Sequence, residues 1–252
     1  MNLSDLTTHL NTTLRVSELP DYSNAVNGLQ LENRSGTVTK VVAAVDATLP
    51  VVRKAVAAGA DLLIVHHGMF WSGLQPWTGS TFERMWLAVE GNLAIYSVHL
   101  PLDVHPELGN NAQIAKALGL VPSGGFLDYK GMDVGVTCEA AIARDELVAR
   151  FQGILAGSRV HVCAGGPPVT RRIGISSGGS GSEVAAAAKA GVDTFITGEG
   201  PHWSYTLAEE LGINVLYGGH YATETFGVKA LARHLQEKFG LSWQFIDHPT
   251  GL

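Results

Sequence analysis

The chain has 252 residues and can bury roughly 70–75% of the surface exposed in its unfolded form, so it needs neither disulfides nor a structural metal to fold. Its formal net charge is −6 and its basic residues are scattered, so nucleic acid is not suggested as a partner. Cys138 and Cys163 are too few for a disulfide framework and form no CxxC pair, as expected in a reducing cytosol.

The N-terminal segment predicts an amphipathic helix rather than a signal peptide. It lacks a basic start, an apolar core and a small-residue cleavage site. Ser4 is the expected N-cap, and the leucines recur at helical spacing: Leu3, Leu6, Leu10 and Leu14. No apolar run approaches the length of a membrane span. We therefore expect a cytoplasmic protein without a membrane partner.

Short apolar runs alternate with helical stretches along the rest of the chain. The first part is expected to contain strand 38–45, helix 50–59, strand 61–65, helix 82–90 and strand 93–98. The second part is expected to contain strand 132–139, helix 145–155, strand 159–165, strand 171–177, helix 182–191, strand 193–198, helix 204–212, strand 214–219 and helix 223–240. This alternation predicts an α/β fold.

The two parts resemble each other. GADLLIVHHG (59–68) aligns with GVDTFITGEG (191–200), and AIYSVH (94–99) matches VLYGGH (215–220) with tyrosine and histidine in step. An acid follows each of these histidines by four residues, at Asp103 and Glu224. The alternative is that alternating strands and helices repeat Ala-Gly-x-Asp and Gly-Leu junctions by chance. The matching histidine and acid, and the equal spacing of 21 residues from each histidine to Leu120 and Leu241, are not general features of such folds. The pattern predicts an internal duplication.

The offset between the copies changes from 132 residues in the first block to 121 in the second. The first copy therefore carries about eleven extra residues, most simply near 71–80. We expect two similar α/β halves, residues 1–125 and 126–252, that form one compact unit around a shared site.

Several histidines follow apolar strands directly: His66, His67, His99 and His220. In open α/β sheets, ligands bind outside the carboxyl ends of the strands, where these side chains would lie. A single histidine at a strand end is ordinarily a hydrogen-bonded structural residue. Several of them together with acids, in two related halves, favour a metal site instead.

His66 and His67 are adjacent, and adjacent residues on a strand point to opposite faces. Either Gly68 lets the backbone turn so that both rings reach one ion, or the two rings serve two different ions. The second arrangement fits a dinuclear site.

His220 and Glu224 are four residues apart at the entrance to a helix, which places both side chains on one face. His99 and Asp103 have the same spacing, but Pro101 predicts an extended loop between them. Imidazole and carboxylate are ligands for Zn, Mn, Fe or Ni, and no thiolate is available for a closed structural zinc site. Glu224 could alternatively complement only the helix dipole.

Other candidates for the site are less specific. The GGSGSE loop could cradle a phosphate through Gly179, Ser180, Gly181 and Ser182, or it could be a tight turn in which Ser182 caps the next helix. Glu199 occupies the column of His67 and is a candidate wall of the site, while His202 either lines the site or is a surface histidine. The aromatic residues of this region more readily pack a mouth or a subunit contact than stack a base: Phe70, Trp71 and Trp77.

Five motifs in this order resemble the Nif-three-like dinuclear metal-centre family, whose members are often named homologues of GTP cyclohydrolase 1 type 2. They are HHGMFW (66–71), H-x-P-L-D (99–103), G-x-G-S (179–182), ITGE (196–199) and GGHYATE (218–224). The resemblance covers nearly the whole chain in its short bacterial form, without an inserted domain. It implies two divalent metal ions per subunit, held by His66, His67, Asp103, His220 and Glu224, with Glu224 bridging. It also implies a homohexameric ring with its metal sites facing inward.

The resemblance places His99 outside the metal ligands, either supporting a ligand or facing the substrate. His99 and His202 are then candidates for proton transfer, because imidazole titrates near physiological pH. The leading hypothesis is a metal-dependent hydrolase of cyclohydrolase type, acting on a C–N bond of a purine-like, pterin-like or cyclic amide substrate.

A different class of function uses the same ligands. A ring-shaped metal-binding or regulatory protein without turnover would use them for metal handling or for a stress or DNA-damage response. A ring that threads DNA would require a positively charged channel and salt-sensitive binding.

Overall fold

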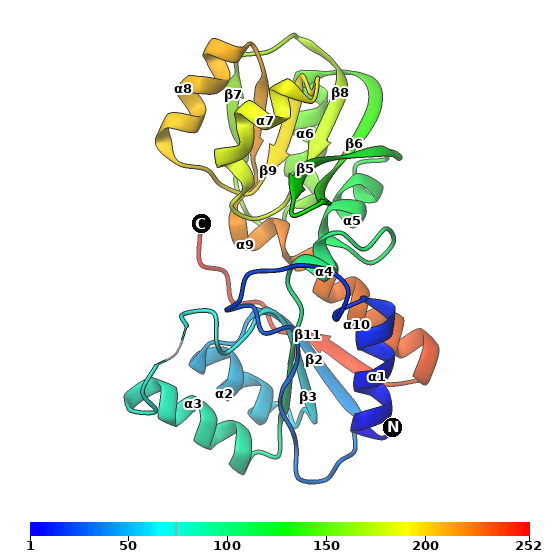
Figure 1. The fold of residues 1–252 in the computed structure, drawn as a ribbon, viewed down its shortest axis with the longest axis vertical. Helices are drawn as coiled ribbons and strands as arrows, with labels where there is room; N and C mark the ends of the chain where they lie inside the picture. The colour runs from blue at the N-terminus through cyan, green and yellow to red at the C-terminus, as the bar shows by residue number, and fades with distance from the viewer. Residues whose placement is uncertain (74) are drawn as a thin grey trace. The chain divides into compact units, whose positions relative to one another are not determined.

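The computed structural model describes residues 1–73 and 75–252 (Figure 1). The chain forms two compact units: unit 1 comprises residues 1–102 and 228–248, and unit 2 comprises residues 103–227 and 249–252. The first unit thus ends at residue 102 and takes up residues 228–248, whereas the halves expected from the sequence were 1–125 and 126–252. Leu74, within the segment expected to carry the extra residues, lies outside the described residues.

Unit 1 is built on a five-stranded sheet with the order β1-β4-β3-β2-β11. The strands are β1 (Gly28–Leu31), β2 (Lys40–Asp46), β3 (Leu62–His67), β4 (Ala94–Ser97) and β11 (Ser242–Phe245). β11, β2, β3 and β4 are parallel, and β1 is antiparallel to β4. All residues of β3 are buried, which explains why its sequence is an unbroken apolar run up to the histidines.

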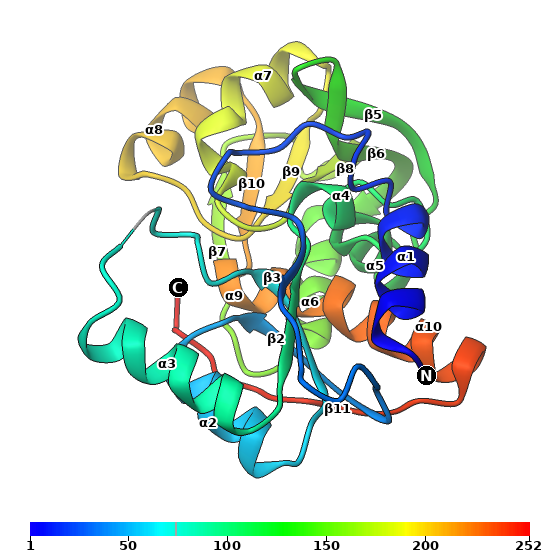
Figure 2. The same ribbon diagram turned by 60° about the horizontal axis from the view of Figure 1, so that its bottom comes forward.

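Helices cover both faces of this sheet (Figure 2). The helices are α1 (Leu3–Thr13), α2 (Leu49–Ala57), α3 (Gly79–Glu90) and α10 (Thr225–Phe239), of which residues 228–239 belong to unit 1. α2 and α3 lie on one face, where Val52 and Ala88 pack with Leu63 of β3. α1 and α10 lie on the other face.

Unit 2 contains a six-stranded sheet with the order β5-β6-β8-β9-β10-β7. The strands are β5 (Pro122–Tyr129), β6 (Met132–Ala143), β7 (His161–Ala164), β8 (Val169–Ile175), β9 (Thr194–Thr197) and β10 (Asn214–Tyr217). The short helix α4 (Leu100–Asp103) starts in unit 1 and ends at the first residue of unit 2. The other helices of unit 2 are α5 (Asn110–Ala117), α6 (Arg144–Ile154), α7 (Val184–Lys189), α8 (His202–Leu211) and α9 (His220–Thr223). β8, β9 and β10 are parallel, and the others pair antiparallel. One hydrophobic core contains Phe151 of α6, and a second contains Val184 of α7.

The same hydrogen bonds recur inside the two units and support the internal duplication. Asp61 Oδ2, before β3, accepts from the backbone amide of Lys40 at 3.0 Å. Asp193 Oδ2, before β9, accepts from the backbone amide of Arg172 at 3.0 Å. Each carboxylate also accepts the preceding amide, so the aligned aspartates start equivalent pairs of parallel strands in the same way.

The strand registers correct the second block of the sequence alignment by one residue. Leu62 lies opposite Ala94, just as Thr194 lies opposite Asn214. Ala94 therefore corresponds to Asn214, an offset of 120 residues rather than 121. The matched tyrosines are one position apart in register, and neighbouring strand positions face opposite sides of a sheet. Backbone hydrogen bonds set this register, whereas the alignment followed side-chain identity.

We expect Asp61→Ala to lower the free energy of unfolding by about 2 kcal/mol, because Thr39 and Lys40 lose a shared acceptor. Burial alone would raise the pKa of Asp61, but hydrogen bonds from Thr39 and Lys40 outweigh burial and lower it below 3.8. The stabilisation is therefore complete above pH 3.8 and is lost as the pH falls through the lowered pKa.

Urea unfolding of the variant and the unchanged protein measures this contribution. The difference between them should shrink when the pH falls well below 3.8. A difference that stays constant over that range contradicts the assignment.

Two local expectations from the sequence are wrong. Asn2, not Ser4, caps α1, and Asn2 Oδ1 accepts from the backbone amide of Ser4 at 2.8 Å. The link from His99 to Asp103 contains the short helix α4 rather than an extended loop. Pro101 falls in the first turn of that helix, where a backbone N–H has no partner within the helix and its loss costs nothing.

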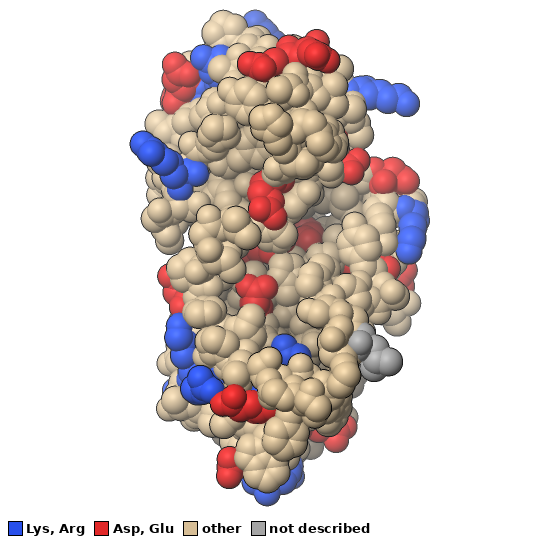
Figure 3. Space-filling view, turned by 90° about the vertical axis from the view of Figure 1, so that its left-hand side faces the viewer, with Lys and Arg blue, Asp and Glu red and all other residues tan. Residues whose placement is uncertain are grey.

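The described residues contain no helix that could span a membrane, and one face of the molecule carries no basic patch. Among residues 1–73 and 75–252, no helix combines the length and the apolar composition needed to cross a bilayer. On the face shown in Figure 3, Lys and Arg side chains are dispersed among Asp and Glu side chains.

Candidate metal centre

Three imidazole rings meet at the carboxyl end of the unit 1 sheet. His66 and His67 end β3, and His99 follows β4. Their ring centroids are 4.9 Å apart for His66 and His67, and 4.8 Å apart for His66 and His99. One nitrogen from each of the three rings lies within 4.8 Å of the others. We call this group the three-histidine cluster, and its donors could hold a metal ion.

The alternation of strand residues does not separate the first two rings. Both residues belong to β3, yet their ring centroids are 4.9 Å apart. His99, expected to lie beyond the ligands, contributes a nitrogen as close as the other two. Trp71 lies against this cluster, with its ring centroid 4.5 Å from that of His99.

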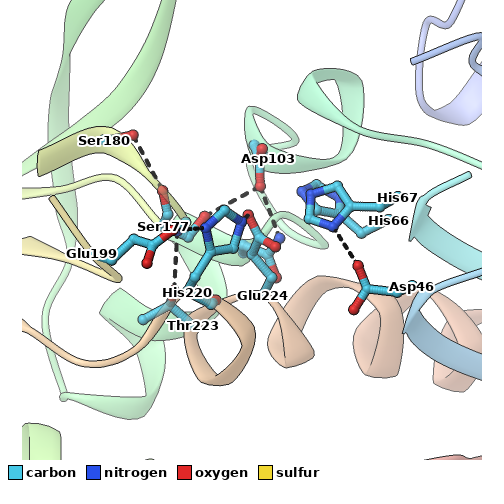
Figure 4. Close-up of polar contacts among 12 residues, drawn as sticks. Asp46, His66, His67, Asp103, Ser177, Ser180, Glu199, His220, Thr223 and Glu224 are labelled. Atoms are coloured by element: carbon cyan, nitrogen blue, oxygen red, sulfur yellow. Dashed lines mark hydrogen bonds and ion pairs between the residues drawn. The ribbon is translucent and has the colours of Figure 1, made fainter. Parts of the chain in front are cut away.

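Each ring of the three-histidine cluster donates a hydrogen bond from Nδ1. His66 Nδ1 donates to the backbone oxygen of Val98 at 3.0 Å, and His67 Nδ1 donates to Asp46 Oδ1 at 2.8 Å (Figure 4). A carbonyl or carboxylate oxygen only accepts, so Nδ1 carries the proton and Nε2 carries the lone pair. Histidines that bind metals are almost always oriented in this way.

Asp21 orients His99. Its Oδ1 accepts from His99 Nδ1 at 2.9 Å, while Oδ2 accepts from Asn27 Nδ2 at 2.7 Å. Burial alone would raise the pKa of Asp21, but hydrogen bonds from His99 and Asn27 outweigh burial and lower it, so the carboxylate is charged. Sequence reasoning missed Asp21, which lies in a loop without periodicity. The available signal was an acid and an amide in PDYSNAVN, a loop that belongs to no helix or strand.

In unit 2, His220 lies between two carboxylates. Its Nε2 is 3.2 Å from Glu224 Oε1, which confirms that the i,i+4 spacing brings the two side chains together. Its Nδ1 is 2.8 Å from Glu199 Oε1 (Figure 4). Burial alone would lower the pKa of His220, but Glu224 and Glu199 outweigh burial and raise it to about 9. Two carboxylates around one ring favour positive charge there, whether a proton or a metal ion supplies it.

Asp103 is buried at the end of α4 and is held by neighbours within unit 2. Its Oδ1 accepts from Asn110 Nδ2 at 2.8 Å and from Ser177 Oγ at 3.3 Å. Asn110 in turn accepts from the backbone amide of Gly227 at 2.6 Å. Sequence reasoning missed Asn110, although an amide seven residues after the candidate ligand, at the start of a helix, was a possible signal.

Gly178 packs directly against Glu224. A Cβ atom at Gly178 would lie 2.2 Å from Glu224 Oε1, and the backbone φ of Gly178 is +64°. The amide of Gly178 donates to Thr223 Oγ1 at 3.0 Å, which ties this loop to the end of α9. Only glycine combines that backbone conformation with so close an approach to the carboxylate.

The remainder of the GGSGSE loop is engaged in local contacts. The amide of Gly181 donates to the backbone oxygen of Glu199, and the hydroxyls of Ser180 and Ser176 lie 2.8 Å apart. The helix expected at 182–191 begins as a 3₁₀ turn, Ser180–Glu183, before α7. Ser182 donates to Glu183 Oε1 at 3.2 Å instead of capping that helix.

Each unit brings one group of the candidate site residues together. Unit 1 assembles the three-histidine cluster, and unit 2 assembles Asp103, His220, Glu224 and Glu199 around the Ser177–Gly178 segment. His202, at the start of α8, is exposed and makes no side-chain hydrogen bond with the described residues. Trp77 is also exposed.

These features define an α/β protein with a repeated βαβ plan and with oriented imidazole and carboxylate groups that could bind metal. A profile of the Duf34/NIF3 (NGG1p interacting factor 3) family matches residues 1–250, and the chain belongs to this family. This confirms the family expected from the sequence motifs.

Relatives cover the chain almost completely. A Deinococcus radiodurans protein named "GTP cyclohydrolase 1 type 2 homolog" is 41% identical over 250 residues, covering 98% of this chain and 94% of the relative. A Halobacterium salinarum protein of the same name is 39% identical over 259 residues and is covered fully. Among solved structures, TTHA1606 from Thermus thermophilus is 39% identical with a TM-score of 0.90, and protein ybgI is 36% identical with a TM-score of 0.91. Each of these two structures covers 100% of this chain and is covered to 100%.

Proposed function

We propose that the protein is a metal-dependent hydrolase with a dinuclear centre. The observation that carries the proposal is the orientation of four histidines. Nδ1 lies 2.8–3.0 Å from a carbonyl or carboxylate oxygen in each of His66, His67, His99 and His220. Oriented rings of this kind present Nε2 to a ligand, which is the arrangement that metal sites use. The proposed ligands are those of the family resemblance: His66, His67, Asp103, His220 and Glu224.

The donor chemistry fits a divalent transition metal. Imidazole and carboxylate groups suit Zn, Mn, Fe or Ni. Burial raises the pKa of the Cys138 thiol to about 11, and it also raises the pKa of Cys163, so both thiols stay protonated at neutral pH. Neither cysteine is therefore a good metal ligand, and a closed thiolate site of the structural zinc type is disfavoured.

The protein's own residues would orient the imidazole ligands and transfer protons. Asp46, Asp21 and Glu199 hold His67, His99 and His220 in one tautomer and one orientation. His99, close to the ligand nitrogens, and His202, exposed at the start of α8, are candidates to pass a proton to the leaving nitrogen. Two bound divalent ions would supply Lewis acidity and a water that is deprotonated near neutral pH.

The name shared by the relatives supports hydrolysis of a ring C–N bond as the reaction class. The expected result is metal-dependent turnover of at least one member of a panel of nucleotides, pterins and cyclic amides. Turnover should be lost after chelation, regained with a divalent ion, and absent in His66→Ala.

Two outcomes would contradict the hydrolase. Turnover that survives both chelation and His66→Ala would exclude the proposed centre. Stoichiometric, reversible metal release to an acceptor, with no turnover across the panel, would favour the metal-handling alternative.

A further inference from the structure

Unit 2 contains a cavity of about 570 Å³ beside His220, on the Nδ1 side of its ring. Its volume lies within the range typical of small-molecule sites. Glu199 lines the cavity, and the same carboxylate accepts from His220 Nδ1 at 2.8 Å. Because Arg159 lies in the wall, we call this cavity the Arg159 cavity.

The basic side chains of the Arg159 cavity form no ion pair with the part of the chain that the structure describes. Arg159, His161 and His202 line it, and all three are exposed. None of them makes a side-chain hydrogen bond or an ion pair with the described residues. Glu199, the acid among the described lining residues, contacts His220. This balance favours an anionic ligand, because a guanidinium group binds phosphate and carboxylate through paired hydrogen bonds.

The start of α8 adds to this preference. Gly200, Pro201 and His202 line the cavity, and Pro201 is the N-cap of this ten-residue helix. The amide of Ser204 already donates to the backbone oxygen of Pro201. The helix dipole nevertheless favours negative charge near this N-terminus. Arginine, histidines and helix terminus thus converge on one hollow.

An aromatic wall closes another side of the Arg159 cavity. The ring centroid of His161 lies 5.5 Å from that of Tyr205 and 6.1 Å from that of Tyr217. The hydroxyl of Tyr217 donates to Ser204 Oγ at 2.8 Å, since the single Ser204 proton is used by the backbone oxygen of Pro201. The tyrosine ring is therefore fixed in place, and its face can pack against a planar ligand.

We propose that the Arg159 cavity binds a small planar compound through a phosphate or carboxylate group, which Arg159 and His161 hold. The planar part then packs on the His161, Tyr205 and Tyr217 rings, beside Glu199. The role of this compound as the substrate of the metal centre rests on the proposed hydrolase. Binding itself requires no metal, because all of these residues belong to unit 2 and none is a proposed ligand.

Phenyl phosphate is the probe, because it combines a planar ring with a phosphate group. Calorimetry or ligand-observed NMR on the full chain measures phenyl phosphate binding. The protein is first treated with a chelator, so that the phosphate group has no metal ion to bind. We expect Arg159→Gln to weaken phenyl phosphate binding at least about tenfold, since a charge-assisted hydrogen bond is lost. Arg171→Gln is the matched control, because Arg171 is an exposed arginine of the same unit outside the cavity. The affinity of this variant for phenyl phosphate should equal that of the unchanged protein.

A second variant tests the aromatic wall. His161→Ala should weaken phenyl phosphate more than inorganic phosphate, because only phenyl phosphate packs on the ring. Benzamidine, a planar cation, should not bind. Arg159→Gln and His161→Ala proteins that bind phenyl phosphate as tightly as the unchanged protein, or tight binding of benzamidine, would overturn the proposal.

His66→Ala separates this proposal from the hydrolase. It should abolish turnover but leave phenyl phosphate binding to the chelated protein unchanged. Loss of turnover in every test together with Arg159-dependent binding would overturn only the hydrolase. Turnover without any effect of Arg159 or His161 on binding would overturn only the Arg159 cavity.

Discussion

Replacing His220 by alanine is expected to lower metal affinity more than about a hundredfold. Losing a hydrogen-bond partner of a ligand already costs about 10–100-fold, and here the ligand itself is removed. The variant also leaves Glu224, which is buried, without the imidazole that lies 3.2 Å away. Unit 2 is then left with its carboxylates alone as proposed ligands, one donor fewer than before.

Elemental analysis after dialysis, followed by competition with a chelating dye, measures the effect. His248→Ala is a suitable control, because His248 contacts Lys54 and belongs to neither group of candidate ligands. Circular dichroism of both variants after chelation shows whether the fold is retained. A His220→Ala protein that keeps its full metal content and affinity would contradict the ligand assignment.

Gly178→Ala is expected to destabilise the protein and to disturb the proposed metal centre through Glu224. A positive φ costs a residue with a side chain roughly 1–2 kcal/mol, and overpacking adds about 1–3 kcal/mol. The added Cβ would lie 2.2 Å from Glu224 Oε1 at a φ of +64°. The carboxylate must move, so metal affinity should fall together with the free energy of unfolding.

Gly119→Ala separates the two contributions. Gly119 belongs to unit 2 and has a φ of +73°, but a Cβ there would meet nothing within 4 Å. It should therefore pay only the conformational cost and keep normal metal binding. Urea unfolding of both variants gives the extra loss of unfolding free energy that the collision with Glu224 causes in Gly178→Ala. Replacing Glu224 by alanine in the Gly178→Ala background should remove that extra loss. Equal loss of metal in both glycine variants would contradict the mechanism.

Much of the fold is predictable from local sequence. Apolar runs such as 61–65 and 193–198 became β3 and β9, because parallel strands buried on both faces require continuous apolar side chains. β1, β5 and β11 were not expected. β1 and β11 have only four residues each, too few for their alternation to stand out, while β5 contains adjacent glycines and is largely exposed.

The site was predictable in its residue types and only partly in its geometry. The strand-end histidines and the His220–Glu224 spacing are local patterns, and the structure joins His220 to Glu224. The relative placement of His66 and His67 was left open between a backbone turn at Gly68 and two separate ions, because an ideal strand points adjacent side chains apart; their ring centroids are 4.9 Å apart. Pro101 was read as preventing a helix, although its place in the first turn permits one.

The sequence by itself determined the class of fold, the duplication and the chemistry of the donors, because these depend on residue type and short-range spacing. Tertiary structure decided the strand register and the acceptors that orient each ring, such as Asp46 for His67 and Asp21 for His99. These partners are 21 and 78 residues apart in the chain. Contacts over such separations depend on how strands and loops pack, and no local pattern in either segment specifies them.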